Sequence, residues 1–301
     1  MAAVSEVGRH EREQVADRLL ESSVRHSYDP FIDIDWDAPA DPDRFWLPPH
    51  RSTLYGTPLW ERLSHAQRVE LTRHEIACAA SAGIWFETVL MQMLVRHYYD
   101  QDPTSRHAQY ALTEVADECR HSVMFGRLLE ALDVPAYQAS PYDHFLGRVL
   151  KTTGTGPHMY AAILIAEEVL DAFQREIMAD ESLQPLIRMV CRIHVVEEAR
   201  HVKYAREELA RQVRVRGPIS LAYSRVVIGR AANAIARRLV RPGIYEAVGI
   251  PGSVGRAAAF ANPHFRETLR WSASRVVAYL TELGLIEGGL ARALWRRSAL
   301  L

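Results

Sequence analysis

The chain has 301 residues, enough for one large helical domain or two average domains. Its 48% hydrophobic and 24% charged residues are typical of a folded domain and exclude a disordered chain, a collagen and a disulfide scaffold as overall descriptions. The net charge of -1, from 36 basic and 37 acidic residues, provides no overall field that would attract nucleic acid or an anionic membrane.

The sequence also predicts a cytoplasmic protein without a membrane segment. No apolar run approaches the roughly 18 residues that a membrane span needs, and the first residues lack the pattern of a signal peptide. Cys78, Cys119 and Cys191 are scattered and have no metal-binding spacing. We therefore interpret them as free thiols that pack as small apolar side chains.

The first 58 residues are predicted to form a helix and an extended arm. Residues 6–25 have helical periodicity. Their apolar stripe comprises Val15, Leu19, Leu20 and Val24. Residues 27–58 contain six of the 15 prolines, and their large apolar side chains need a surface to cover, so we interpret them as an ordered strap. These side chains are Phe31, Ile34, Trp36, Phe45 and Trp46.

From about residue 59 onward the chain is predicted to be almost wholly helical, because apolar residues recur at 3.6 spacing without alternating β-branched runs. The expected helices are roughly 64–99, 103–131, 142–151, 157–180, 183–215, 218–239 and 263–284. We expect one all-α domain, 1–301. Its parts are the helix and strap at 1–58, a helical bundle at 59–215 and carboxy-terminal helices at 216–301.

A repeated motif pairs a carboxylate with an imidazole. Glu118 and His121 form one Glu-x-x-His motif, and Glu198 and His201 form another; residues three apart share a helix face. Two motifs alone are weak evidence, because 23 glutamates and 13 histidines would produce about one by chance.

Stronger evidence lies upstream of both motifs. Glu87 precedes Glu118 by 31 residues, and Glu167 precedes Glu198 by the same interval. Turn-forming residues (YYDQDPTS and ADESLQP) interrupt each interval near its middle. Each segment is therefore expected to be a helical hairpin whose two glutamates return to the same height.

Two such hairpins packed face to face would bring four glutamates and two histidines to one point. This is the arrangement of di-iron and di-manganese sites in ferritin-like four-helix bundles. Oxygen and nitrogen donors without thiolate suit iron or manganese better than structural zinc. Glu87 and Glu167 lie in strongly apolar segments, where bound metal ions would neutralise otherwise costly acids. We therefore expect two iron ions, with manganese as an alternative.

Neighbouring residues raise three further questions. His194 and Glu114 each lie four residues before a motif glutamate, on the same face. His194 is thus placed to be a third imidazole ligand, whereas Glu114 stays open between a position beside the ligands and the helix surface. Glu168 competes with Glu167 as the fourth carboxylate, and the symmetry of the repeat favours Glu167.

Charged residues flank the ligands inside both motifs. They are Asp117, Arg120, Glu197 and Arg200. Histidine ligands usually need an acceptor on their other ring nitrogen. Arg120 could pair with Glu197, and Arg200 with Asp117, across the bundle; ordinary surface ion pairs are the alternative.

The combined residues resemble the p-aminobenzoate N-oxygenase family of non-haem di-iron oxygenases. Ferritin, ribonucleotide reductase and acyl desaturase sites share the two Glu-x-x-His motifs but typically lack a histidine at the position of His194. The stretch SYDPFIDIDWDAPADPDRFWLPPHRSTLYGTPLWERLS, followed by RHE at 73–75, also resembles that family's amino-terminal region. The resemblance extends from about residue 27 to 206, and more loosely to the end of the chain.

The resemblance implies a complete ligand set. One iron would be held by Glu87, Glu118 and His121, and the other by Glu167, His194, Glu198 and His201, with Glu118 and Glu198 bridging. It also implies that the reduced metal pair uses O2 to convert an arylamine to hydroxylamine, nitroso or nitro products. Electrons would come from an external donor such as a reductase, because no motif here binds flavin or a nicotinamide cofactor.

Other functions stay open. A di-iron carbon hydroxylase or desaturase of a small or carrier-bound substrate is one alternative, and a non-catalytic iron-binding protein is another. The helix face before Glu87 carries Ala79, Ala80 and Gly83, which offer no cation for a benzoate carboxylate. A larger neutral amine is therefore also compatible with the sequence.

A basic amphipathic helix at 225–241 predicts a homodimer through the helices after Pro218. Its apolar residues are Val226, Val227, Ala231, Ile235 and Leu239. Its arginines, at 225, 230, 237, 238 and 241, could form a solvated face, dock an acyl-carrier protein or line a substrate entrance.

Overall fold

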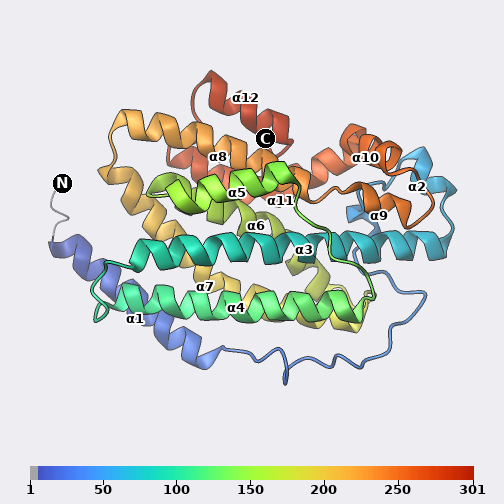
Figure 1. Cartoon of the computed structure of the whole chain (residues 1–301), viewed down its shortest axis with the longest axis horizontal. Coiled ribbons are helices and arrows are strands. Elements are labelled where there is room, and N and C mark those ends of the chain that lie inside the picture. The colour runs from blue at the N-terminus through green and yellow to red at the C-terminus, as the bar shows by residue number, and fades with distance from the viewer. Residues whose placement is uncertain (1–5) are drawn as a thin grey trace.

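The computed structural model describes residues 6–301, and every regular element within them is a helix (Figure 1). Two long hairpins form the centre of the molecule. One consists of α3 (His65–Tyr98) and α4 (Arg106–Ala131), and the other of α6 (Pro157–Ala179) and α7 (Pro185–Val215). The helices of each hairpin pack along their length, and α4 also packs against α7. The predicted all-α helical bundle is confirmed.

The remaining helices surround this centre. α1 (Glu6–Arg25) lies against α4 and α7, while α5 (Pro141–Thr153) lies against α3. α11 (Pro263–Glu282) packs on α6, and α8 (Pro218–Arg238) packs between α6 and α12 (Gly289–Ser298). The short elements are η1 (Pro49–Arg51), α2 (Pro58–Arg62), α9 (Pro242–Glu246) and α10 (Gly252–Ala261).

Local chemistry explains where the long helices begin. Ser64 and Gln67 form a capping box at the start of α3, in which each side chain accepts a hydrogen bond from the other residue's backbone N–H. Pro157 and Pro185 occupy the first positions of α6 and α7, where a missing N–H costs nothing. The seven helices predicted from periodicity are present within a few residues of their expected ends.

The apolar stripe predicted for α1 is partly wrong. Val24 is 85% exposed, whereas Ala16 and Ser23 are buried against the bundle. The helix is therefore rotated so that small residues make the closest approach. Arg12 anchors it, because its guanidinium donates two hydrogen bonds to the buried carboxylate of Glu208 on α7.

The strap at 27–58 follows the bundle surface, as Figure 1 shows for the long blue segment after α1. Ile34 and Trp46 are buried and Trp36 and Phe45 are half-buried, as expected, but Phe31 is 65% exposed. Phe31 instead lies near Arg127, whose guanidinium stands 4.8 Å from the ring centre.

Backbone hydrogen bonds fasten the start of the strap to α7. The Tyr28 N–H donates to the Glu197 carboxylate at 3.0 Å. The Arg200 guanidinium donates to the His26 carbonyl oxygen at 2.9 Å. The first residues of the strap are therefore bound to two side chains that belong to the repeated motif.

Three smaller expectations can be compared with the structure. Cys78 and Cys191 are buried free thiols as predicted, but Cys119 is exposed. Helix α3 is long and apolar enough to cross a membrane by length and composition, yet 56% of that window is buried inside the protein. Two apolar residues of α8, Ile228 and Ile235, are buried within the same chain.

Candidate metal centre

The seven predicted ligands come together in the middle of the bundle. Each of the four central helices contributes at least one of them, and every one of these side chains is at most 6% exposed. They are Glu87 on α3, Glu118 and His121 on α4, Glu167 on α6, and His194, Glu198 and His201 on α7.

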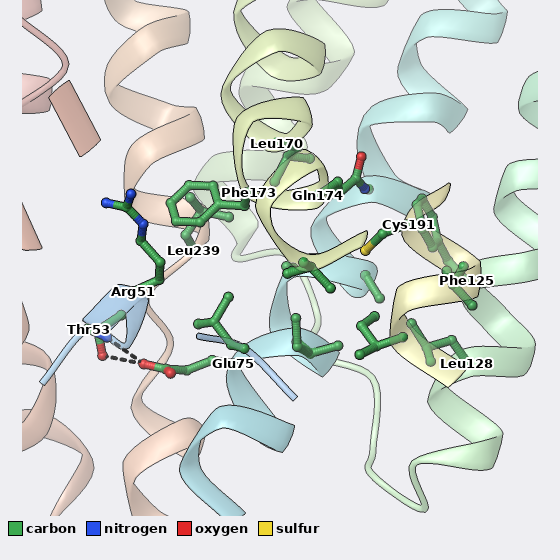
Figure 2. Close-up of a pocket in the computed structure, with 18 of the residues that line it drawn as sticks. Arg51, Thr53, Glu75, Phe125, Leu128, Leu170, Phe173, Gln174, Cys191 and Leu239 are labelled. Carbon is green, nitrogen blue, oxygen red and sulfur yellow. Dashed lines mark hydrogen bonds between the residues drawn. The ribbon is translucent and has the colours of Figure 1, made fainter. Parts of the chain in front are cut away.

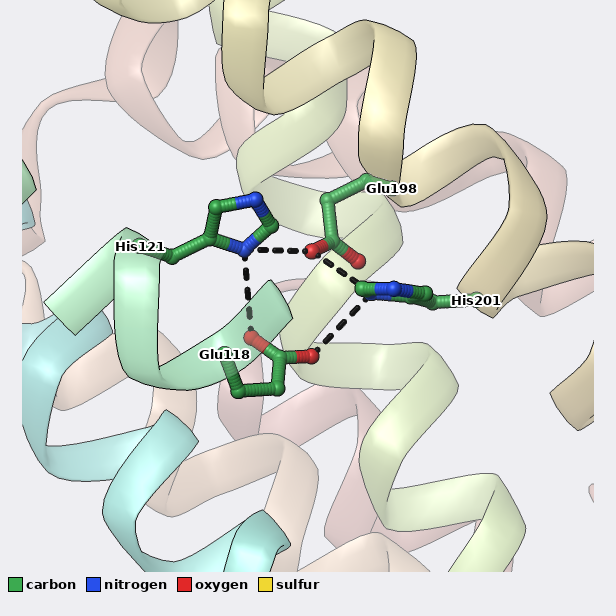
Figure 3. A group of neighbouring side chains, drawn as sticks. All are labelled: Glu118, His121, Glu198 and His201. Carbon is green, nitrogen blue, oxygen red and sulfur yellow. Dashed lines mark hydrogen bonds and ion pairs between the residues drawn. The ribbon is translucent and has the colours of Figure 1, made fainter. Parts of the chain in front are cut away.

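Two glutamates occupy the centre of the cluster (Figure 3). Glu118 Oε2 lies 3.2 Å from His121 Nδ1, and Glu118 Oε1 lies 3.1 Å from His201 Nδ1. Glu198 Oε1 lies 3.1 Å from His121 Nδ1 and 2.9 Å from His201 Nδ1. Each carboxylate thus contacts both imidazoles, which is the position a ligand shared by two metal ions would occupy.

The other three side chains complete two groups around this centre. Glu87, His121 and His194 each offer an atom within 4.8 Å of the others, and so do Glu167, His194 and Glu198. His194 Nε2 is 3.6 Å from Glu87 Oε1 and 3.8 Å from Glu198 Oε1. His194 therefore points into the cluster, between the two groups.

The acid that precedes each motif glutamate holds the histidine of the other motif. His201 Nε2 is 3.1 Å from the Asp117 carboxylate, and His121 Nε2 is 2.8 Å from the Glu197 carboxylate. This leaves both Nδ1 atoms directed at the centre. Gln174 plays the same part for His194, since its Oε1 is 2.8 Å from His194 Nδ1.

The expected arginine pairs are half correct. Arg200 contacts Asp117 across the bundle at 3.1 Å, as predicted. Arg120 does not reach Glu197: it pairs with Asp117, one turn away on its own helix. Glu197 is already engaged by His121, which the sequence analysis did not foresee.

Glu168 and Glu114 are two further acids near the cluster. Glu168 accepts two hydrogen bonds from Arg206, at 2.9 and 2.6 Å, and is thus a structural neighbour of Glu167. Glu114 is buried, not on the helix surface, and no described residue makes a hydrogen bond to its Oε2. Burial raises the pKa of Glu114 to about 8; His201 opposes this shift, and the neighbouring carboxylates add to it.

The electrostatics of the cluster favour a bound cation. Burial and the neighbouring carboxylates raise the pKa of Glu167 well above its usual range. Burial alone would lower the pKa values of His121 and His201, but their carboxylate neighbours raise both well above the ordinary value. Protons on the imidazoles thus balance the acids in the absence of metal, and divalent cations would replace those protons.

The donor set fits a pair of metal ions. His194 Nε2 and Glu198 Oε2 are buried and have no hydrogen-bond partner among the described residues, although unpaired buried polar atoms are costly. Three imidazoles, four carboxylates and no thiolate suit iron or manganese. The His194 and Glu198 side chains both belong to the group that could hold a metal ion together with Glu167.

Two cavities lie between the helices of the bundle. The first, which we call the Glu75 cavity, has a volume of about 80 Å³ and lies between α3, α4, α6 and α7 (Figure 2). The second, the α5–α8 cavity, has a volume of about 410 Å³ and is lined by α3, α5, α6 and α8. Glu167 lines the second cavity, and so does Arg230, one of the arginines considered for a substrate entrance.

Comparison with known proteins identifies a family over most of the chain. The family described as "P-aminobenzoate N-oxygenase AurF" matches residues 9–284. Curated relatives from Mycobacterium tuberculosis and Mycobacterium bovis, both named as uncharacterized proteins, are 29% identical over 297 residues. The match covers 92% of this chain and 84% of each relative.

Solved structures with a similar fold are R2-like ligand-binding oxidases, which are variants reconstituted with a Mn/Fe cofactor. One superimposes with a TM-score of 0.52 at 11% identity and covers 88% of this chain and 92% of its own. Another gives a TM-score of 0.51 at 11% identity, with 90% and 92% covered. These similarities show that the chain shares the all-α fold of the R2-like ligand-binding oxidases.

Proposed function

This chain belongs to the p-aminobenzoate N-oxygenase family, and on that premise we propose that it is an O2-dependent di-iron oxygenase that N-oxygenates an arylamine. The observation that carries the proposal is the position of His194. It adds a third imidazole to a buried cluster in which Glu118 and Glu198 each contact both motif histidines. We place the reaction in the cytoplasm, where its buried free thiols would stay reduced.

In this proposal all seven clustered side chains hold the metal pair. When bound, the pair supplies O2 reduction and oxygen transfer, chemistry that no side chain can supply alone. Glu118 and Glu198 would each be shared by the two metal ions, because each carboxylate contacts both motif histidines. Manganese at one of the positions is the alternative cofactor, given the same donor atoms.

The protein's own part is to orient the ligands and exclude water. Asp117, Glu197 and Gln174 accept the remaining N–H groups of the three imidazoles and fix their orientation. Ser122 donates to Glu87 Oε2 at 2.8 Å and holds that carboxylate toward the cluster. The near-complete burial of these groups keeps water from competing with the amine.

The overall reaction balances with an external reductant. Formation of a hydroxylamine consumes the arylamine, O2, two electrons and two protons, and it releases water. One oxygen atom forms the new N–O bond and the other leaves in the water. The electrons would be supplied by a reductase or a chemical donor.

The proposal is tested by oxygenation of arylamines under isotopically labelled O2. We expect iron-loaded protein with a reductant to give hydroxylamine, nitroso or nitro products whose oxygen comes from O2. Glu198→Ala should abolish this oxygenation. Glu207→Ala, which removes a more exposed acid from the same α7, is its control. If labelled oxygen were found only on carbon atoms of the product, the protein would be a carbon hydroxylase. If iron were oxidised without any product, it would be an iron-binding protein.

A further inference from the structure

The α5–α8 cavity reaches the metal cluster at Glu167. This side chain lines the cavity, and its carboxylate also belongs to the group that could hold a metal ion with His194 and Glu198. None of the seven candidate ligands lines the Glu75 cavity. Of the two cavities, the α5–α8 cavity is therefore the one whose occupant can lie beside the metal pair.

The volume of the α5–α8 cavity exceeds what one aromatic ring needs. It is about 410 Å³, whereas an apolar protein cavity of roughly 150 Å³ is enough to bind benzene. The lining residues on α6 run from His158 to Glu167, which are separated by roughly 13 Å along the helix. An amine with a single ring beside Glu167 would leave much of this volume unfilled, so the cavity fits a molecule of at least two rings.

Small side chains create this volume. Ala162 and Ala166 stand one turn apart on α6, and Ala231 and Ala234 stand one turn apart on α8. The two helices pack against each other, so larger side chains at these positions would fill the space between them. A single substitution can therefore remove much of the cavity without touching a candidate metal ligand.

The walls of the cavity favour an apolar occupant. The rings of Trp85 and Phe86 on α3 pack edge to face, with their centres 5.0 Å apart. His158, at the other end from Glu167, is engaged by Ser224 and by the Thr155 N–H at 3.4 Å each. No described residue that lines the cavity has a buried polar side-chain atom without a hydrogen bond. The occupant therefore gains by burying apolar surface and needs no polar group along its body.

The cavity opens to the surface between α5 and α8. Three of its lining residues are exposed: Val149 on α5, and Tyr223 and Arg230 on α8. Glu167, in contrast, is only 6% exposed. An arylamine would therefore enter between α5 and α8 with its amine end first and leave its other end near the surface.

We propose that the α5–α8 cavity is the substrate site, and that it selects a bulky, largely apolar arylamine of at least two rings whose nitrogen lies beside Glu167. This inference rests on the proposed function, because it assigns the substrate class of that same metal centre. Single-ring amines occupy only part of the cavity and bind more weakly.

Two neutral arylamines that differ by one ring test this selection. They are para-toluidine and 4-benzylaniline, in which a phenyl group replaces one hydrogen of the methyl group. Their dissociation constants are measured by equilibrium dialysis with ferrous protein under anaerobic conditions, so that no oxygenation occurs. We expect 4-benzylaniline to bind at least about tenfold more tightly, because its second ring fills apolar volume that para-toluidine leaves empty.

Ala231→Phe fills the cavity from α8, at a position that is only half-buried. We expect this variant to lose most of the tenfold preference, through weaker binding of 4-benzylaniline. Ala234→Phe, also half-buried on the same wall, is a second filling variant in case the first does not fold. Ala222→Phe adds the same side chain at an exposed position of α8 outside the cavity and is the matched control, which should keep the preference.

The outcomes separate the two proposals. Equal binding of the two amines by the wild type overturns the assignment of the α5–α8 cavity, and this comparison requires no variant to fold. A preference that persists in a folded filling variant also overturns it, because the second ring would then bind elsewhere. If the preference is present in the wild type and lost in the filling variant, but the bound amine is not oxygenated, the proposed reaction fails while the substrate-sized binding site stands.

Discussion

Each motif histidine is oriented by an acid from the opposite hairpin. Asp117 precedes Glu118 and holds His201, while Glu197 precedes Glu198 and holds His121. The hydrogen bonds therefore cross between α4 and α7 in both directions. A change at one motif disturbs the histidine of the other, so the two metal positions are coupled through the protein.

The first prediction concerns the two central glutamates. Glu118→Ala or Glu198→Ala should reduce iron from about two per chain to well below one and abolish oxygenation, because each carboxylate contacts both imidazoles. Iron content and product formation are measured on the same samples. A double variant that retained two irons would contradict the assignment, and Glu207→Ala, which removes a half-buried acid on α7, serves as the control.

The second prediction concerns the third imidazole. His194→Ala should fold normally but lower the occupancy of one iron, because His194 Nε2 is buried, lies 3.6 Å from Glu87 Oε1 and makes no hydrogen bond to any described residue. Mössbauer spectra of the iron-loaded variant measure this loss at one of two positions. Spectra identical to those of wild type would mean that His194 is structural.

The third prediction is a pH dependence of stability that originates at Glu75. Its pKa is about 7 in the folded protein and near 4.5 in the unfolded chain, so between these values the folded state binds more protons. The free energy of unfolding contributed by this group therefore falls as pH rises through that window, by roughly 3 kcal/mol at most.

Glu75→Gln removes this contribution. The stability of the variant relative to wild type should increase from about pH 5 to pH 8, as measured by chemical denaturation across that range. Glu61→Gln should give a difference that is flat with pH, because that side chain is 66% exposed. A flat difference for Glu75→Gln would mean that the carboxyl titrates normally.

At the scale of elements, hydrophobic periodicity predicted the long helices and missed the shortest ones. The four bundle helices have 23 to 34 residues, enough turns for an apolar face to repeat. Helices α2 and α9 have five residues each, and α10 and α12 have ten. So few turns give no reliable period.

The candidate ligands were predictable because the hairpin repeat constrains them, whereas their partners depend on side-chain rotation. Arg120 and Asp117 lie three residues apart and pair locally, which spacing alone did not distinguish from a pair across the bundle. Gln174 was missed, although its position seven residues after Glu167 places it on the same face of α6. In the sequence Glu75 is only the last residue of the RHE motif at 73–75, because its burial beside a cavity depends on the folded chain.

The fourth prediction concerns the packing of α9 against α10. A Cβ added at Gly255 would lie 2.2 Å from Cγ of the buried Tyr245, whose hydroxyl is 3.0 Å from the Thr53 hydroxyl. Gly255→Ala should therefore destabilise the protein by about 1 to 3 kcal/mol. Thermal and chemical denaturation measure the loss.

Gly126→Ala is the matched control for this substitution. Gly126 is exposed inside α4, and nothing lies within 4 Å of an added Cβ. Alanine has the better helix propensity, so this variant should be neutral or up to about 1 kcal/mol more stable. Equal effects at both positions would show that α10 moves to accommodate the methyl group.

At the scale of the whole molecule, the fifth prediction is a homodimer. The apolar residues of α8 first proposed for its interface include Ile235, which packs inside the same chain. A dimer formed after Pro218 would therefore use exposed residues there, such as Ile219 and Tyr223. Sedimentation at micromolar concentration should give twice the 34.1 kDa of one chain. A single species of 34.1 kDa would refute the dimer.

Because the strap is attached to α7, metal binding and the ordering of the strap would be thermodynamically coupled. Glu197 holds both the Tyr28 N–H and His121, and Arg200 joins the His26 carbonyl oxygen to Asp117. Ions that fix the imidazoles would also fix these two side chains and, through them, the start of the strap. By linkage, bound metal would stabilise the attached strap by a coupling free energy. Detachment of the strap would weaken metal binding by that same free energy. A protease that cleaves the detached strap would therefore cut the metal-free protein faster than the loaded one.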